Sequence, residues 1–511
     1  MKKGILVTAA VLLFVVVCGC SDNDDENAPD LRVSAFRSAL KNSGFAVSEG
    51  STHQINPFQF IQNRLIDSCS GNNAGQPYKC FPIPIIPGEE DEQGRKQLGI
   101  FRLQPYEAIV YVGPTPPEAD YFSYTAFLWV RHHDSLIEKG DWLFAALGDP
   151  LNNLTIKTEG GGSPFEKNTM VVFTPDQGTY KRIVAAAQPA GYPESMINLF
   201  VIPSTNPIPL AYLGLGPGSD SMMILVRTAN FKNEKKGNDY LNNNAYGTVF
   251  RVTPDSPPVL QPYEQPAARD RNWQKETDLI PDLQNGLERL KTAILAQTEH
   301  VQFRSFESIR WFYDSRDVLP DDPTSPAYHQ FVAGEASDTP YLRTAENGSP
   351  ANFTLGMDDL VIVYGVNHAA TGIATYSSLS AYGDWQTNQC DPPMQFIFGC
   401  NHNVWNGIAG MTSDSFVSNG KSSAEEYLPG DPVARYLYAV KVKRTCEPGE
   451  KFCVPVPQPG EDPEHKDNPY YGIGLTDPMM IGYRAYLNPA TKSGPSYDDI
   501  VFDRAIWFKT K

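Results

Sequence analysis

The sequence is poor in long apolar runs, in histidine and cysteine, and in basic relative to acidic residues. Its longest N-terminal apolar run, Ile5 to Val17, has about a dozen residues, whereas a bilayer-spanning helix needs about 20. No later run reaches that length, so we expect the rest of the chain to be soluble. The 42 Lys and Arg residues against 59 Asp and Glu give a formal net charge of −17. This charge repels nucleic acid and anionic lipid, so both are excluded as nonspecific partners.

Recognisable catalytic and cofactor motifs are also missing. The chain has no H-E-x-x-H, P-loop or EF-hand sequence, and no G-x-G-x-x-G between a predicted strand and a predicted helix. Ser163 follows three glycines, but Pro164 comes next and the second glycine of a nucleophile elbow is absent. The sequence therefore predicts no metal and no cofactor.

What the sequence does contain at its start is the order of a bacterial export signal. The basic residues Lys2 and Lys3 precede the apolar run, which ends in Val17-Cys18-Gly19-Cys20. These four residues resemble the lipobox of bacterial lipoproteins. The resemblance implies that residues 1–19 are a signal peptide, that Cys20 carries lipid as the new N-terminus, and that residues 20–30 are a disordered acidic tether. Cys18 departs from the usual lipobox, which leaves ordinary cleavage or a shifted site as the alternative.

The residue after Cys20 gives a hint about location. Ser21 stands where an aspartate would favour retention in the inner membrane of many Gram-negative bacteria. The lipoprotein resemblance therefore implies a lipid-anchored protein of the cell envelope, at the outer membrane, with the membrane as a partner through Cys20. A small molecule or an envelope polymer is the further partner to consider.

The six remaining cysteines fall into three pairs that are close in sequence. Each pair closes a short loop that contains turn-forming residues, and an oxidising compartment favours disulfides. The expected disulfides are Cys69–Cys80, Cys390–Cys400 and Cys446–Cys453. Zinc is the competing interpretation, although no pair has C-x-x-C spacing, and buried free thiols are a third.

Short apolar runs separated by 43 prolines and 40 glycines predict more strand than helix. The fold class we expect is a strand-rich α+β protein with two β-rich domains and a helical insert between them. The expected divisions after the tether are an N-terminal segment with a disulfide loop (31–97), a first β-rich domain (98–253), a Pro-rich connector with the helical insert (254–350), and a second β-rich domain (351–511). Helical spacing of apolar residues is clearest at Leu283, Leu287, Leu290, Ile294 and Leu295, with further helices predicted from Leu31 and over Thr179 to Ala187.

Four short matches in the same order indicate an internal duplication. They pair Val110-Tyr111 with Val363-Tyr364, Tyr124 with Tyr376, Arg227-Thr228 with Arg444-Thr445, and Phe250-Arg251 with Tyr483-Arg484. Apolar strands followed by turns also recur by chance, so two unrelated β-rich domains, or a single large sheet with the helical insert packed across it, remain open.

The strongest hint of a ligand site is a pair of Asn-His steps in the second half. Asn367-His368 and Asn401-His402 each follow an apolar strand in glycine-rich text with aromatic residues nearby, notably Tyr382 and Trp385. A titratable imidazole, amides and flat apolar rings suit a small-molecule or sugar site. Structural hydrogen bonding by unrelated loop histidines is the competing interpretation.

Two functional classes follow. The first is a cell-envelope lipoprotein with a binding or structural role, exposed to the periplasm or the cell surface. The second is a secreted hydrolase-type enzyme whose residues converge only in three dimensions, with a site around His368 and His402.

Overall fold

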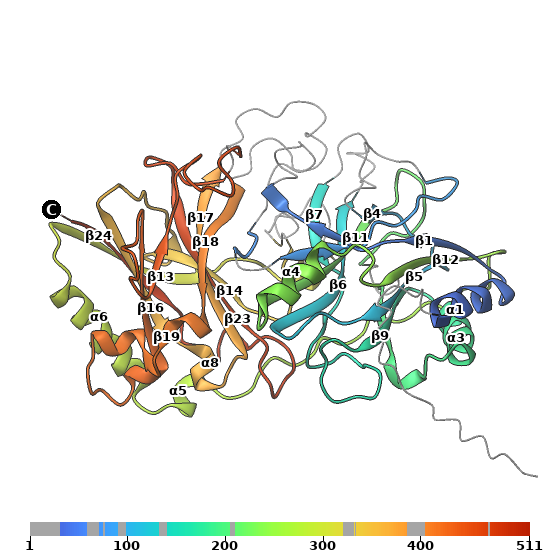
Figure 1. Cartoon of the computed structure of the whole chain (residues 1–511), viewed down its shortest axis with the longest axis horizontal. Coiled ribbons are helices and arrows are strands. Elements are labelled where there is room, and N and C mark those ends of the chain that lie inside the picture. Colours follow the sequence, from blue (N-terminus) through green and yellow to red (C-terminus); the bar gives the residue numbers. More distant parts are fainter. Residues whose placement is uncertain are drawn as a thin grey trace, which may run out of the picture.

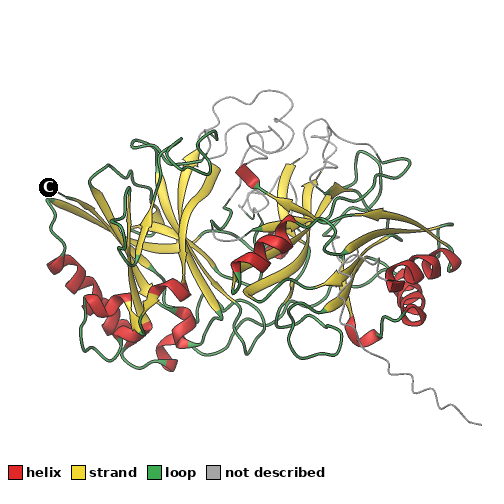
Figure 2. Cartoon of the chain, in the orientation of Figure 1, coloured by secondary structure: helices red, strands yellow, loops and turns green. Residues whose placement is uncertain are grey.

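The computed structural model describes residues 31–58, 71–74, 77–89, 99–131, 141–204, 210–319, 332, 334–385, 404–468 and 471–510. The chain is a strand-rich α+β protein with several sheets and few helices (Figure 2). No helix among these residues is long and apolar enough to cross a bilayer.

The first half contains two sheets. The outer sheet has the order β1 (Phe45–Gly50), β12 (Thr248–Pro254), β5 (Ala108–Pro114), β9 (Asn168–Thr174), β10 (Ile197–Val201). The inner sheet has the order β2 (His53–Ile55), β3 (Tyr78–Cys80), β11 (Ser221–Phe231), β6 (Ala119–Arg131), β7 (Asp141–Ala146), with β4 (Ile100–Phe101) beside β11 and β8 (Leu151–Asn152) beside β6. The parallel pair in these sheets is β9 with β10.

The second half contains one large sheet. Its order is β18 (Val404–Thr412), β17 (Tyr376–Trp385), β23 (Met479–Tyr486), β14 (Tyr341–Glu346), β13 (Gln302–Arg310), β24 (Arg504–Lys509), β16 (Asp359–Val366), β21 (Leu437–Lys443), β22 (Cys453–Pro455), with β15 (Ser349–Pro350) beside β14. Strand β13 pairs with β24 over residues 302–306 and with β14 over residues 307–310. The sheet curls until β18 and β22 contact each other, so it is nearly closed. A small hairpin joins β19 (Val417–Ser418) and β20 (Lys421–Ser422).

The predicted helices at Leu31, Thr179–Ala187 and Leu283–Leu295 are confirmed as α1, α3 and α6. The helices are α1 (Leu31–Asn42), α3 (Gln177–Ala187), α4 (Glu234–Asn242), α5 (Glu276–Leu279), α6 (Leu283–Gln297), α7 (Ser315–Val318) and α8 (His368–Thr371). Helix α6 buries one apolar stripe, as its periodicity requires. Helices α1, α3 and α6 lie at the two outer ends of the molecule, whereas β6, β14 and β23 lie near its middle (Figure 1).

The strands of the two halves follow the same order in sheet and sequence. The outer series β1-β12-β5-β9-β10 corresponds to β13-β24-β16-β21-β22, with a parallel last pair in each. The inner series β3-β11-β6-β7 corresponds to β14-β23-β17-β18. Strands β1, β2 and β3, which we expected in a separate N-terminal segment, pair within the sheets of the first half.

Two of the four expected matches lie on equivalent strands. Val110-Tyr111 and Val363-Tyr364 are on β5 and β16, and Tyr124 and Tyr376 are on β6 and β17. The other two do not. Arg227-Thr228 lies on β11, but Arg444-Thr445 follows the end of β21. Phe250-Arg251 lies on β12, which corresponds to β24, whereas Tyr483-Arg484 lies on β23. An apolar strand pattern does not specify which strand it is, so such matches slip easily from one strand to another.

The two halves meet through reciprocal contacts of two buried arginines. Arg227 on β11 donates to the carbonyl oxygen of Gly334 in the second half, and Arg484 on β23 donates to the carbonyl oxygen of Gly71 in the first. Gly71 and Gly334 each lie seven residues before the first residue of β3 and β14, respectively. Both arginines have a tyrosine opposite them on one neighbouring strand and a serine on the other. These sets are Tyr78, Arg227 and Ser123, and Tyr341, Arg484 and Ser378.

The described cysteines form one disulfide, Cys446–Cys453, as the sequence predicts. Cys80 is instead a free, fully buried thiol, which differs from the expected bond to Cys69. It lies on β3 between β2 and β11, and burial raises the pKa of its thiol to about 12, so the thiol stays protonated. Cys69, Cys390 and Cys400 lie outside the described residues.

We expect the double substitution Cys446→Ser/Cys453→Ser to lower the free energy of unfolding by about 2–3 kcal/mol. A cross-link between residues seven apart removes about that much chain entropy from the unfolded state. Urea unfolding of oxidised protein measures the difference, and reduced wild-type protein is the matched control. Equal stability of oxidised wild type and variant would contradict this prediction.

Candidate functional site

The predicted site residue His368 is buried, with 2% of its surface exposed. It begins the short helix α8, which is capped by Asn367: the Asn367 side-chain oxygen accepts a hydrogen bond from the Ala370 backbone at 3.3 Å. Asn367 is itself 3% exposed. A ligand site in a loop after the strand would need these two side chains to reach solvent, but the chain turns into a helix there and buries both.

The imidazole of His368 lies between two carboxylates. Its Nδ1 donates to Glu276 Oε1 at 2.8 Å, and its Nε2 lies 3.6 Å from Asp503 Oδ2, an ion-pair distance. Burial by itself lowers the pKa of His368, but the carboxylates of Glu276 and Asp503 outweigh it and raise the pKa to about 10. His368 is therefore an imidazolium at neutral pH, which is a poor general base.

The two carboxylates have further partners, so the charged group is enclosed by hydrogen bonds. Glu276 accepts from the Thr371 hydroxyl at 2.7 Å and from the Val501 backbone N–H at 2.9 Å. Asp503 accepts from the Tyr438 hydroxyl at 2.8 Å. This Glu276–His368–Asp503 network joins α5, α8 and the segment before β24.

The other predicted site residues do not join this network within the described chain. Tyr382 is fully buried on β17, where it accepts from Arg484 at 2.5 Å and packs edge-on against Trp311. Trp385 ends the same strand, and its side chain lies outside the described part of the structure. Asn401 and His402 also lie outside the described residues, so the expected pairing of two Asn-His steps stays a prediction.

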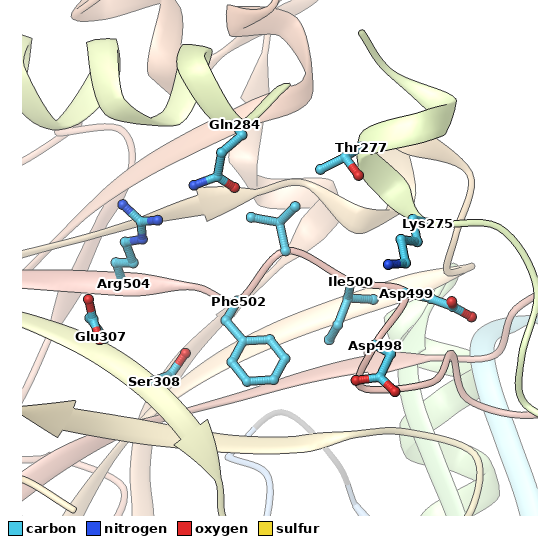
Figure 3. A pocket seen from close by; sticks show the side chains of 11 residues that line it. Lys275, Thr277, Gln284, Glu307, Ser308, Asp498, Asp499, Ile500, Phe502 and Arg504 are labelled. Carbon is cyan, nitrogen blue, oxygen red and sulfur yellow. The ribbon is translucent and has the colours of Figure 1, made fainter. Parts of the chain in front are cut away.

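A cleft of about 400 Å³ lies next to the network (Figure 3). Its walls come from α5, the start of α6, the middle of β13 and the segment 498–504. Ile500, Val501 and Phe502 supply its apolar floor. Figure 3 shows Arg504 and Glu307 at one end, and Lys275 with Asp498 and Asp499 at the other. The volume lies in the range of about 300–1,000 Å³ typical of small-molecule sites.

Five polar side chains around the cleft make no hydrogen bond or ion pair with the described residues. They offer a cation, a hydroxyl, an amide and two carboxylates. They are Lys275, Thr277, Gln284, Glu307 and Asp498. These groups keep their full capacity to donate to or accept from a ligand.

The floor of the cleft is held from behind by the buried network. The backbone N–H of Glu276 donates to the carbonyl oxygen of Asp499 at 2.7 Å, and the Glu276 carboxylate holds Val501. The backbone N–H of Trp273 donates to the Asp499 side chain at 2.8 Å. His368 therefore positions the floor through Glu276 and Asp503 without reaching the cavity.

The residues around the cleft have little signal in the local sequence. Asp498, Asp499 and Asp503 are close in sequence, but Asp503 pairs with His368 and Asp499 binds the backbone of Trp273. Lys275, Gln284 and Glu307 had no local signal, because they come from three different elements. Among the described residues, the one metal-like grouping is Cys446, Glu450 and Cys453, in which the cysteines form the disulfide and Glu450 pairs with Lys441 and Lys443.

No protein-family model matches the chain, and none of the curated proteins matches it either. Among solved structures, the chain is similar to a putative uncharacterized protein from Burkholderia cenocepacia, with 10% identity and a TM-score of 0.38 over 94% of this chain and 91% of that one. It is also similar to the VPA0106 protein from Vibrio parahaemolyticus, with 10% identity and a TM-score of 0.34 over 94% and 98% of the two chains. Similarity at this level assigns no function.

We expect His368→Gln to lower the free energy of unfolding at pH 6 by about 3–5 kcal/mol, because it leaves two buried carboxylates without their cation. The folded-state pKa of His368, about 10, lies above the ordinary 6.5, so its stabilising contribution is complete below pH 6.5 and lost as the pH rises towards 10. Wild-type stability should therefore fall over this range by up to about 1.4 kcal/mol per pH unit more than that of the variant.

Guanidinium unfolding between pH 6 and pH 10 measures both effects. His465→Gln is the matched control, since His465 pairs with Asp462 at the surface and should contribute less than about 1 kcal/mol. The same pH slope in wild type and His368→Gln would show that His368 does not carry the charge.

Proposed function

We propose that the chain is a cell-envelope lipoprotein, anchored through Cys20, whose folded body binds a small ligand in the cleft between α5, α6, β13 and the segment 498–504. The observation that carries the binding role is the set of polar side chains that face this cleft without protein partners. A polar group that is not committed to the fold is available to a ligand.

The anchor rests on the N-terminal residues alone. A basic start, a short apolar run, Gly19 and Cys20 stand in the order that a lipidated export signal requires, and Ser21 favours the outer membrane. The acidic residues after Cys20 would keep the tether extended, since like charges repel.

The hydrolase alternative has less support than the binding role. His368 was one of its two candidate residues, and a buried imidazolium between two carboxylates neither reaches a substrate nor accepts a proton near neutral pH. His402, the other residue on which the alternative rests, lies outside the described residues.

The two halves are, in this proposal, two copies of one fold. Equivalent strands occur in the same order, and Arg227 and Arg484 make equivalent contacts in opposite directions. In a two-fold dimer interface, each subunit donates from the same group to the same acceptor on the other subunit. The chain would then be a covalently joined pseudo-dimer, with the Pro-rich segment 254–272 as the link.

Cys20→Ala should move the protein from the membrane fraction to the soluble fraction or block its processing, because the thiol that accepts the lipid is gone. Fractionation and intact mass of the N-terminal peptide measure this. Cys18→Ala is the matched control and should leave fractionation and lipid mass unchanged. Normal membrane fractionation of Cys20→Ala, together with no lipid on the wild-type peptide, would rule out the anchor.

Binding in the cleft should disappear when the cavity is filled. In a thermal-shift screen of amino acids, dipeptides, nucleosides and sugars, we expect at least one compound to stabilise wild type but not Gln284→Trp. A ligand at 100 times its Kd adds about 2.7 kcal/mol to the stability of the form that binds it. Ala296→Trp, on an exposed part of α6 away from the cleft, is the matched control and should respond like wild type. Equal stabilisation of wild type and Gln284→Trp by every active compound would place the binding elsewhere.

A further inference from the structure

We infer that the cleft takes a neutral sugar of one or two rings. This inference rests on the proposed binding function and names the chemical class of its ligand. Three properties of the cleft point to a sugar: its charge balance, the combination of an apolar floor with polar walls, and the fixed position of that floor.

The charge of the cleft disfavours an anionic ligand. Arg504 already pairs with Glu288, so its charge is largely compensated. Among the lining side chains without partners in the described residues, Lys275 is the one cation, against the two carboxylates of Glu307 and Asp498. The whole chain carries −17, so a phosphate or a uronic acid would be repelled both locally and at long range. A neutral ligand avoids both the local and the long-range repulsion.

The surface of the cleft matches the two kinds of surface that a sugar ring presents. A pyranose has C–H groups on its flat faces, which pack on apolar and aromatic side chains such as Ile500 and Phe502. Its hydroxyl groups point outward from the ring edge and both donate and accept hydrogen bonds. Carboxylates at Glu307 and Asp498, the Gln284 amide and the Lys275 ammonium together offer both donors and acceptors.

The floor is fixed before a ligand arrives. Asp499 is 7% exposed and is held by the backbone N–H groups of Trp273 and Glu276. Ser308, which lines the cleft, donates its hydroxyl to the Asp503 carbonyl. A floor that does not have to be ordered on binding loses less affinity to conformational entropy, which matters for a weakly interacting ligand such as a sugar.

The test uses the purified full-length protein in detergent with three neutral disaccharides, maltose, cellobiose and chitobiose, and with digalacturonic acid as the anionic probe. Saturation-transfer NMR detects binding, and calorimetry gives Kd. We expect at least one neutral disaccharide to bind and digalacturonic acid not to bind. Phe502→Ala should raise Kd by about tenfold and Glu307→Gln by about three- to tenfold, because they remove the stacking surface and a charged acceptor.

Matched controls separate the cleft from the general surface. Phe303 lies on the same strand as Glu307 and is 46% exposed, and Glu299 carries an exposed carboxylate after α6. Phe303→Ala and Glu299→Gln should therefore leave Kd unchanged. If Phe502→Ala fails to fold, the Kd values of Glu307→Gln and Gln284→Ala test the inference instead, because these exposed positions tolerate substitution.

Two results would overturn the sugar inference. The first is that neither the neutral disaccharides nor any neutral sugar of the broad screen binds wild type, or that those which bind do so equally in the cleft variants. The second is that the compound blocked by Gln284→Trp in the broad screen is a peptide or a nucleoside. In the second case the cleft remains a binding site and the proposed function stands, so the two failures are distinguishable.

Discussion

The reciprocal contacts of Arg227 and Arg484 constrain the whole molecule. Each of these arginines is 4% exposed, and a buried cation is destabilising unless its N–H groups find acceptors. Each arginine finds a backbone carbonyl in the other half of the chain, at Gly334 and at Gly71. Each half therefore depends on the other for a backbone acceptor of its central arginine, although Arg484 also donates to Tyr382 in its own half, and separating the halves would remove both carbonyl acceptors.

The tyrosines around these arginines extend the same constraint. Tyr121 and Tyr376 both pack against Tyr486, at 4.6 and 5.3 Å between ring centroids, so rings from the two halves share one cluster. The hydroxyl of Tyr121 donates to Asp338 in the other half at 3.1 Å. Polar contacts of fixed geometry, as well as buried apolar area, therefore hold the inner strands of the two halves together. These contacts give the interface between the halves a defined register.

The sequence predicted the strand-rich α+β class, three helices, one disulfide and the placement of two strand matches, because each depends on local periodicity or on short loops. It missed the equivalence of Arg227 with Arg484 and paired Arg227 with Arg444 instead. The two equivalent strands share a Pro-Tyr step, at Pro77-Tyr78 and Pro340-Tyr341, with a glycine seven residues before the tyrosine. Gly99 stands at the same distance before Tyr106, so this combination alone does not identify the strand.

The site was less predictable than the fold for a physical reason. The sequence indicated His368 as a candidate ligand-binding residue, but a histidine after a strand can face solvent or begin a helix, and the partners that decide between these outcomes are Glu276 and Asp503. Local sequence does not specify contacts of such separation. The cleft depends on the same long-range contacts, since its floor is held by Glu276 and its walls come from separate elements.

The two halves also differ in the kind of cation that they bury between two carboxylates. Because of this difference, the packing of the second half depends on protonation. In the first half Arg251 on β12 lies between Glu89 and Glu107, and a guanidinium keeps its charge at every physiological pH. In the second half the cation that lies between two buried carboxylates is the His368 imidazolium, which can lose its proton. His368, which would lose this proton, binds Glu276 and Asp503. Through these two carboxylates it holds the floor of the cleft. A change of protonation would therefore loosen the half that carries the cleft and leave the buried ion pairs of Arg251 intact.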